Sequence, residues 1–304
     1  MENLWFHIPE FPEFKELSLE DKPLFDRIFS QYPPLISEFT FTNLFIWRDA
    51  YRIKVSRMDH FICLLSDREE ASFFFPPIGE GDVVKCFIEW SQYLKERGIS
   101  PKIERVPEEM AMGKDWGREG FEVKLDQDQS DYIYLTKDLI NLEGRRYHRK
   151  RNHIKQFKEK YPYQYISLDP EWTSQCLQLS TEWCDLRHCE ANPGLMQESM
   201  AIKEALTHFE KLGIKGGAIL INQKVEAFTL GESLNRETVV IHIEKANPAF
   251  EGLYTVINQT FLEREWSAYP YVNREQDLGQ EGLRKAKESF FPHHMINKYQ
   301  VTLK

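Results

Sequence analysis

The chain has 304 residues, of which 41% are hydrophobic and 13% aromatic, and this composition supports a large core and excludes a disordered chain. Its formal net charge of −9 excludes a chain that is basic overall, so any polyanion would have to be bound by a local cluster of positive charge. The apolar runs are too short to span a bilayer, and residues 1–14 lack the pattern of a signal peptide. Five scattered cysteines are typical of thiols in a reducing compartment, so we expect a cytoplasmic protein.

The first half of the chain alternates helical and strand patterns. The expected elements are a helix over 18–33, a buried aromatic segment over 39–51, strands over 51–58, 60–67 and 71–77, a helix over 82–98, and shorter strand and helix pieces over 101–110 and 121–127. Ser18 is a suitable N-cap for the first helix, and Gly98 a suitable stop for the second. The polar stretch 125–131 is the best candidate for a linker.

The second half has a more regular order. The expected elements are a strand over 163–169, helices over 171–186 and 195–213, strands over 216–222, 224–233 and 238–246, a helix over 250–266, a strand over 269–276, a helix over 278–290 and a closing strand over 293–303. This order predicts an α+β fold and resembles the GNAT (acyl-CoA N-acyltransferase-like) fold. The first half repeats its opening more loosely. We therefore expect two tandem GNAT-like domains with mixed sheets flanked by helices, an N-terminal one over 1–130 and a C-terminal one over 131–304 that carries the active site.

A basic segment over residues 144–160 stands out in this acidic chain. It holds eight Lys or Arg and one Glu, which gives +7 and leaves −16 for the remainder. Tyr147, Ile154, Phe157 and Tyr161 recur at helical spacing and are expected to anchor one face. One interpretation is a surface that binds phosphates of tRNA or another phosphate-bearing ligand; the other is a solvated helix beside the acidic remainder. The residues expected to bind phosphate are Arg145, Arg146, Arg149, Lys150 and Arg151.

Three segments carry a resemblance to a known family. They are LINLEGRRYHRKRNHIKQF at 139–157, NREQDLGQEGLRKAK at 273–287 and SFFPHHMINKYQV at 289–301. Together they resemble uncharacterised bacterial proteins related to the C-terminal catalytic domain of phosphatidylglycerol lysyltransferase. The resemblance covers about 10–304 and implies a tandem GNAT fold similar to that of the Fem aminoacyl transferases. It also implies transfer of an aminoacyl group from charged tRNA to an amine or hydroxyl acceptor.

Two departures from the relatives qualify the donor and the acceptor. The lysyltransferase works behind a multi-span membrane domain, and this sequence has no such segment, so a lipid acceptor is less favoured while peripheral membrane contact stays open. GNAT enzymes that use acetyl-CoA hold its pyrophosphate on a Gly-rich turn at a helix N-terminus. The equivalent turn over 244–254 has one glycine, Gly252, and Pro248 lacks an N–H group. Aminoacyl-tRNA is therefore favoured over acetyl-CoA as donor, and no cofactor is assigned.

Polar residues on two expected strands are the candidates for catalysis. Alternation places His242 and Glu244 on one face of the strand over 238–246. In the segment NREQDLG, Asn273, Glu275 and Asp277 alternate on one face, and Arg284 and Lys287 share a face of the next helix. We expect His242, Glu244, Asp277 and Lys287 to be catalytic, with Asn273 and Arg284 binding substrate. The other interpretation is that these residues are ordinary solvated positions.

Two further groups of residues are weaker candidates for a site. Cys184, His188 and Cys189 supply only three ligands for a tetrahedral zinc site, so no metal is expected, and these cysteines are interpreted as thiols. His293 and His294 open the closing strand and are expected to point to opposite faces.

Besides aminoacyl transfer, two other functions stay open at the level of the sequence. One is an acyl-CoA-dependent N-acyltransferase. The other is a non-catalytic module that binds an anionic partner through the basic segment. The fold alone does not choose among them, because one fold hosts many chemistries.

Overall fold

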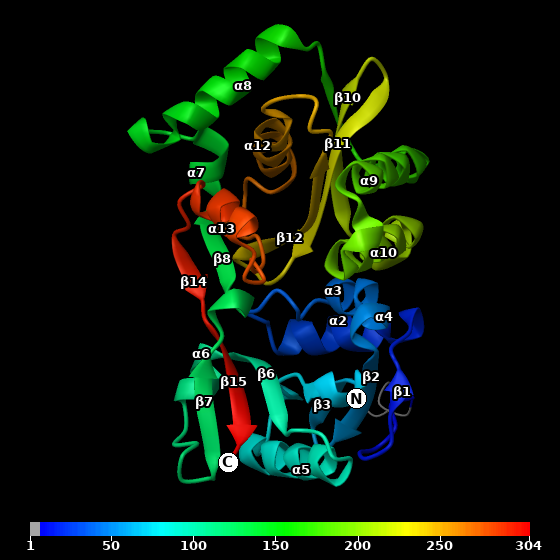
Figure 1. The fold of residues 1–304 in the computed structure, drawn as a ribbon, viewed down its shortest axis with the longest axis vertical. Helices are drawn as coiled ribbons and strands as arrows, with labels where there is room; N and C mark the ends of the chain where they lie inside the picture. Colours follow the sequence, from blue (N-terminus) through cyan, green and yellow to red (C-terminus); the bar gives the residue numbers. More distant parts are fainter. Residues whose placement is uncertain (1–6) are drawn as a thin grey trace. The chain divides into compact units, whose positions relative to one another are not determined.

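The computed structural model of the protein describes residues 7–304 and divides them into two compact units (Figure 1). The first unit holds the chain up to Asp131 together with Gln276–Arg284 and Met295–Lys304, and the second holds Tyr132–Glu275 and Lys285–His294. The chain thus first passes between units one residue from the expected division at 130/131. Two later segments, which we expected in the second domain, pack with the first unit. The expectation of no signal peptide over 1–14 falls partly on residues 1–6, outside the described residues.

The first unit is built on a mixed sheet. Its strands are β1 (Lys15–Glu16), β2 (Ile53–Met58), β3 (Phe61–Ser66), β4 (Phe73–Phe74), β5 (Ile78–Gly79), β6 (Lys102–Pro107), β7 (Phe121–Leu125) and β15 (Lys298–Leu303). The order is β1-β2-β3-β4-β6-β15-β7, with β5 also paired to β3. Its helices are α2 (Lys22–Gln31), α3 (Phe41–Ile46), α4 (Arg48–Tyr51), α5 (Val83–Glu96) and α6 (Glu108–Met112). Phe74, Phe87 and Trp90 are fully buried and belong to the core that α5 forms against the sheet.

The closing strand expected over 293–303 is wrong as one element. It divides into β14 (His294–Ile296), which joins the second sheet, and β15, which joins the first. β15 lies antiparallel to both β6 and β7. Chain order alone cannot reveal this insertion, because the partners of β15 lie about 180 residues earlier in the sequence.

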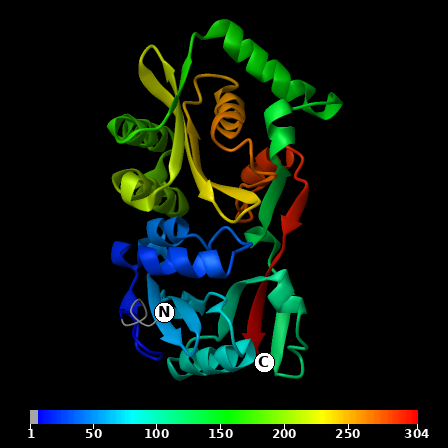
Figure 2. The same cartoon turned by 180° about the vertical axis from the view of Figure 1, so that it is seen from behind.

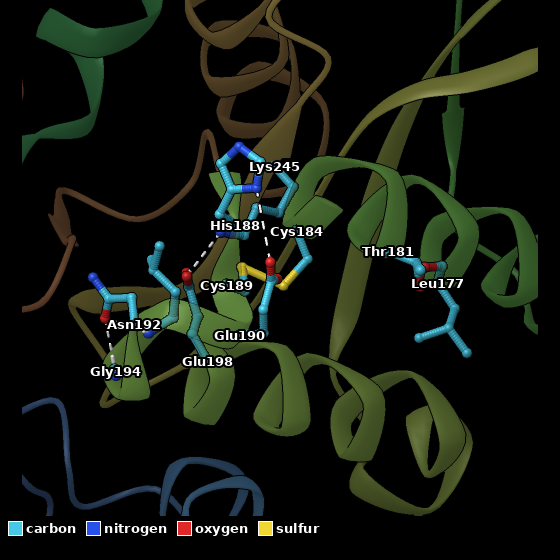
Figure 3. Close-up of a disulfide and its surroundings, with 11 residues drawn as sticks. Leu177, Thr181, Cys184, His188, Cys189, Glu190, Asn192, Gly194, Glu198 and Lys245 are labelled. Carbon is cyan, nitrogen blue, oxygen red and sulfur yellow. Dashed lines mark hydrogen bonds and ion pairs between the residues drawn. A yellow bond between two sulfur atoms is a disulfide. The ribbon is translucent and has the colours of Figure 1, made fainter. Parts of the chain in front are cut away.

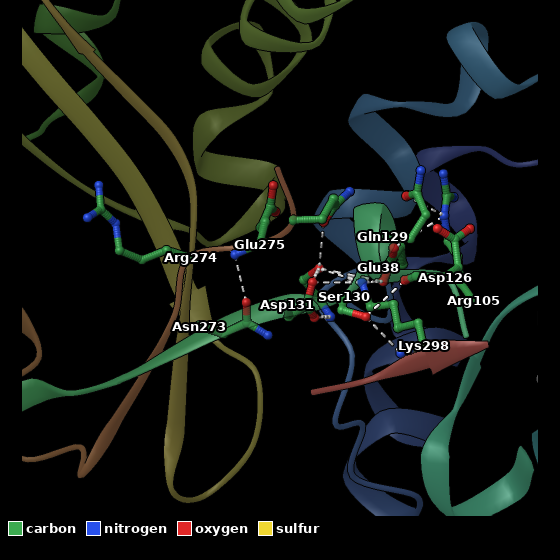
Figure 4. Close-up of polar contacts among 12 residues, drawn as sticks. Glu38, Arg105, Asp126, Gln129, Ser130, Asp131, Asn273, Arg274, Glu275 and Lys298 are labelled. Atoms are coloured by element: carbon green, nitrogen blue, oxygen red, sulfur yellow. Dashed lines mark hydrogen bonds and ion pairs between the residues drawn. The ribbon is translucent and has the colours of Figure 1, made fainter. Parts of the chain in front are cut away.

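A buried network of charges fixes β15 inside the first unit (Figure 4). Lys298 is fully buried, and its Nζ donates to Glu38 Oε2 at 2.6 Å and to Asp131 Oδ1 at 2.7 Å. Arg105 Nε lies 3.3 Å from Glu38 Oε1, and Ser37 donates to Asp131 through its backbone and hydroxyl. Two cations therefore face two carboxylates, as buried charges require.

The second unit contains a seven-stranded mixed sheet with helices on both faces (Figure 2). Its strands are β8 (Asp131–Leu135), β9 (Gln164–Ser167), β10 (Lys215–Ile221), β11 (Lys224–Ser233), β12 (Thr238–Ala246), β13 (Tyr271–Asn273) and β14, in the order β14-β8-β13-β12-β11-β10-β9. Its helices are α7 (Thr136–Asn141), α8 (His148–Lys160), α9 (Thr173–Arg187), α10 (Pro193–Thr207), α11 (Phe209–Leu212) and α12 (Leu253–Glu265), and α13 (Glu281–Glu288) spans the division between units. α9 and α10 cover one face and α12 the other, so β10 and β11 are buried almost throughout.

Candidate functional site

The second sheet opens between β12 and β13. These two strands pair in parallel only over Thr238–Val240 and Tyr271–Asn273. β12 then continues to Ala246, whereas the chain leaves β13 after Asn273 and turns through Glu275, which has a φ of 57°. Past the last paired residues, polar side chains meet across the opening: Glu275 contacts His242, and Arg274 contacts Glu244. We call this opening the β12–β13 gap.

His242 lies at the start of the gap between two carboxylates. Its Nδ1 is 2.8 Å from Glu275 Oε1, its Nε2 is 2.9 Å from Glu232 Oε1, and its side chain is 1% exposed. Burial alone lowers the pKa of His242, but the hydrogen bonds and charges of Glu232 and Glu275 outweigh it and raise the pKa to about 9. The imidazole is therefore protonated at neutral pH, so it acts as a fixed cation there and does not accept a proton.

Glu244 lies one pleat further along β12 and is held by two donors. Arg274 Nη2 lies 3.1 Å from its Oε1, and Asn258 Nδ2 from α12 lies 2.8 Å from its Oε2. The Arg274 guanidinium also lies over the rings of Tyr134 and Phe290, at 5.8 and 4.9 Å from their centroids. Its buried Nη1 makes no hydrogen bond to the described residues. Glu244 and Arg274 thus form a partly desolvated ion pair with one donor left over.

Lys150 of α8 brings an amine close to Arg274 and Glu244. Its Nζ lies 2.8 Å from Ser289 Oγ and 3.6 Å from the centroid of the Phe290 ring, the same ring that Arg274 covers. Burial and, after it, the charge of Arg274 lower the pKa of Lys150 while Glu244 opposes the shift, and together they bring it to about 8. A sizeable neutral fraction exists near physiological pH. The sequence pointed to Lys150 only as a phosphate contact, because nothing local reveals that Phe290 will cover it.

Lys287 and Asn273 organise the backbone that leaves β13. Lys287 is buried, and its Nζ donates to the carbonyls of Arg274 and Glu275, the second at 3.0 Å. Asn273 Oδ1 accepts the Glu275 N–H at 2.7 Å. Both residues therefore support the turn that carries Arg274 and Glu275 to the gap. Their expected catalytic and binding roles stay predictions.

Asp277 and Arg284 form a different cluster, within the first unit. Arg284 Nε lies 2.8 Å from Asp277 Oδ2, and its Nη2 lies 2.7 Å from Asp128 Oδ1. Asp277 Oδ1 also accepts the Gly279 N–H at 2.8 Å. These contacts close the loop over 276–284. His242 and Glu244 thus lie together in the gap. Asp277 and Arg284 lie in the loop over 276–284 instead.

The basic segment forms α8 and the short 3-10 turn before it. Ile154 and Phe157 are buried as the helical spacing indicates, and Tyr147 is buried just before the helix. Of the five cations expected to bind phosphate, Arg145 and Arg149 are exposed and make no ion pair with residues 7–304. The other three have partners within the second unit. Arg146 pairs with Asp138, Arg151 donates to the carbonyls of Leu142 and Gly144, and Lys150 is the residue described above.

The expectation of thiols at Cys184 and Cys189 is wrong, because the two residues form a disulfide (Figure 3). It links the end of α9 to the turn before α10, and the other three cysteines are buried and unpaired. Nearby, Lys245 Nζ lies 2.9 Å from Glu198 Oε2 on α10 and 3.6 Å from the Trp183 ring centroid. Within residues 7–304 no three His, Cys, Asp or Glu side chains gather as metal ligands, and no helix is long and apolar enough to cross a membrane.

Comparison with known proteins shows the family of the chain. Residues 29–302 match the family model described as phosphatidylglycerol lysyltransferase, C-terminal. The chain belongs to this family. It is also 24% identical over 191 residues to an uncharacterized protein of Mycoplasmoides gallisepticum, a match that spans 62% of this chain and 61% of that protein.

Solved structures confirm the fold. A conserved protein of unknown function from Bacteroides thetaiotaomicron is 34% identical, with a TM-score of 0.88 over 96% of this chain and 99% of that one. The C-terminal domain of a protein named as a lysylphosphatidylglycerol synthetase from Agrobacterium fabrum has a TM-score of 0.67 at 11% identity, over 94% and 92%. FemX shares the architecture, with a TM-score of 0.56 at 10% identity over 95% of this chain and 96% of that one. So does a tandem GNAT protein from the clavulanic acid biosynthesis pathway, with a TM-score of 0.51 at 9% identity over 95% of this chain and 98% of that one. The predicted α+β fold with tandem GNAT-like domains is confirmed.

Proposed function

We propose that the protein transfers an aminoacyl group from a charged tRNA to an amine or hydroxyl acceptor. The observation that carries this proposal is the β12–β13 gap, where paired carboxylates and cations meet in a partly buried setting. Membership of the phosphatidylglycerol lysyltransferase C-terminal family supports the reaction class. A donor of this kind is made in the cytoplasm, so the proposal includes a cytoplasmic location.

Each group in the gap has a proposed task. The ammonium of the aminoacyl group would be held by the carboxylates of Glu232 and Glu275, which His242 fixes in place. The acceptor passes a proton to the neutral amine of Lys150, the proposed base, as it attacks the ester carbonyl. The ester C–O bond then breaks, and the ribose oxygen of the tRNA leaves as a hydroxyl by taking that proton from Lys150. Arg274 Nη1 has no hydrogen bond within the described chain, and it is the proposed donor to the oxyanion that forms on the carbonyl.

The α12 N-terminus favours tRNA over an acyl-CoA donor. A pyrophosphate cradle needs backbone N–H groups that are free to bind it. Here the N–H groups of Ala249, Phe250 and Leu253 donate to Asn247 Oδ1, to the Asn247 carbonyl and to the Phe250 carbonyl. Glu251 is exposed just before the helix and adds negative charge. This loop therefore offers few donors to a nucleotide cofactor.

A transfer assay tests the proposal. Purified protein is incubated with tRNA charged with a labelled amino acid and a panel of amines, polyols and anionic lipids, and the label that reaches the acceptor is measured. Glu244→Gln should lower the transfer rate roughly 10²–10³-fold, because it removes the negative charge that positions Arg274, the proposed oxyanion donor. Glu182→Gln is the control, since the partners of Glu182 among the described residues, Gln178 and Lys224, lie outside the gap. If wild type transfers no label from any tRNA, the proposal is wrong, and the acyl-CoA-dependent N-acyltransferase and the binding module are the functions left.

A further inference from the structure

Three aromatic rings gather at the start of β13, outside the gap. The His293 ring lies nearly parallel to that of Tyr271, with centroids 6.0 Å apart and planes at 27°. The His294 ring contacts both edge-on, at 5.9 Å from Tyr271 and 5.2 Å from His293. The expectation that the two histidines point to opposite faces is therefore wrong, because His293 precedes β14 and only His294 belongs to the strand. We call these three rings the aromatic platform.

The platform is open to solvent and is not held by polar contacts. His293 and His294 are exposed and Tyr271 is half-buried. None of the three side chains makes a hydrogen bond or ion pair with the described residues, although the His293 backbone N–H donates to the Ile133 carbonyl. Partial burial, together with the charge of His293, lowers the pKa of His294, so its ring is neutral at physiological pH. Exposed rings with unused polar edges are poor candidates for a structural role.

The chain connects the platform directly to the basic start of α8. The Tyr147 hydroxyl donates to the Phe290 carbonyl at 2.9 Å. Phe291 is 39% exposed, its ring lies 5.3 Å from that of Tyr147, and the Arg146 guanidinium lies 5.3 Å from its centroid. His293 follows two residues later. The exposed cations Arg145 and Arg149 belong to the same end of α8.

Exposed aromatic rings beside unpaired cations match the chemistry of single-stranded nucleic acid. Unpaired bases stack on His, Tyr and Phe rings and on guanidinium planes, while their phosphates bind nearby cations. We propose that Tyr271, His293 and His294 stack an unpaired nucleobase of a single-stranded RNA segment whose phosphates contact Arg145 and Arg149. The proposal deepens the proposed function and rests on it for the identity of the RNA, an unpaired segment of the donor tRNA.

Short oligonucleotides separate base stacking from phosphate binding. The binding of a fluorescent single-stranded tetra-adenylate RNA is measured by anisotropy, beside an abasic phosphodiester oligomer of the same length. The double variant His293→Ala/His294→Ala should bind the RNA roughly 10- to 100-fold more weakly and the abasic oligomer unchanged. His294→Phe keeps a ring at the position and should retain wild-type affinity. His188→Ala removes an exposed histidine at the end of α9 and is the control.

The outcomes are decisive in both directions. The inference is overturned if wild type does not bind the RNA, if the alanine variant binds it like wild type, or if RNA and abasic oligomer lose affinity equally. It is also overturned if His294→Phe fails as badly as alanine while circular dichroism shows a folded chain. A platform that binds RNA in a protein without transfer activity would refute the proposed function alone. Full transfer activity in a protein whose aromatic platform does not bind RNA would refute only this inference.

Discussion

At the scale of single residues, His242 shows how two neighbours can reverse the effect of burial. The pKa of His242 is about 9 in the folded protein, above its value of about 6.5 in an unfolded chain. The resulting stabilisation is fully present below pH 6.5 and is lost as the pH rises through 9. We expect the imidazole to titrate well above pH 8 by NMR, and Glu275→Gln to lower that midpoint by more than one unit. Glu190→Gln changes a residue that pairs with His188 and should leave the titration midpoint of His242 unchanged. A wild-type midpoint near 6.5 would contradict the arrangement.

Lys298 is the residue whose loss should most damage the first unit. Replacement by Met keeps most of the length of the side chain but leaves Glu38 and Asp131 without their shared cation. Burial already raises the pKa of Glu38 while Lys298 opposes that shift. Breaking one side of a buried network costs about 3–5 kcal/mol, so Lys298→Met should lower the free energy of unfolding by that amount in urea denaturation.

A matched control tests that interpretation. Lys85 forms an exposed pair with Asp59, at 2.9 Å. Lys85→Met should change the free energy of unfolding far less than Lys298→Met does, because solvent screens such pairs. Equal effects of the two substitutions would mean that the network around Lys298 carries no special weight.

At the scale of elements, α8 is the test of the basic segment. Arg145→Glu/Arg149→Glu reverses the charge of the two exposed cations that lack ion pairs within residues 7–304, so the affinity for tRNA should fall. The slope of log affinity against log salt concentration should become shallower by the amount expected for the loss of about two phosphate contacts. Filter binding at several salt concentrations measures both. Lys155→Glu is the matched single control from the same helix, where Lys155 already faces Glu159 at 3.8 Å. If the double variant kept the salt dependence of the wild type, the role of α8 would be structural only.

The turn before α12 gives a second element-scale prediction. The N–H groups of Ala249, Phe250 and Leu253 donate within the loop, and Gly252 packs so closely that an added Cβ would lie 2.7 Å from the His153 carbonyl oxygen. The loop therefore has little freedom to rearrange around a pyrophosphate. Isothermal titration with acetyl-CoA should detect no binding below about 100 μM, weaker than the low-micromolar end of ordinary substrate affinities. Low-micromolar affinity would instead favour an acyl-CoA-dependent N-acyltransferase.

At the scale of the whole molecule, β15 completes a sheet whose other strands come mostly from the first 125 residues. Val301 is fully buried there, so Val301→Asp should destabilise the first unit by several kcal/mol, since it buries an unpaired charge. Hydrogen exchange should accelerate in β2, β3 and β6 far more than in β10 and β11. Thr302→Asp, at a half-buried neighbouring position, should have a much smaller effect, and equal acceleration in both sheets would contradict the division into two units.

The sequence predicted regular elements well and the assembly of the site only in part. Helical periodicity identified α5, α9 and α12 within a few residues, because their apolar faces are local patterns. Strand alternation put His242 and Glu244 on one face, and both line the gap. The alternation of Glu275 and Asp277 misled, because the chain leaves β13 at Asn273 and turns. Lys150, β15 and the disulfide depend on contacts between distant segments, which periodicity does not encode.

The interleaving of β15 between β6 and β7 has a consequence for how the protein is made. A ribosome releases the chain from its N-terminus, so β6 and β7 emerge long before residues 298–303. Until those residues arrive, the facing edges of β6 and β7 have no strand between them and Glu38 and Asp131 lack Lys298. Most of the second sheet can pair during synthesis, whereas the first sheet cannot join β7 to β6 until β15 arrives. The first unit should therefore complete its sheet after most of the second sheet has formed, and its unpaired strand edges are exposed to aggregation until then.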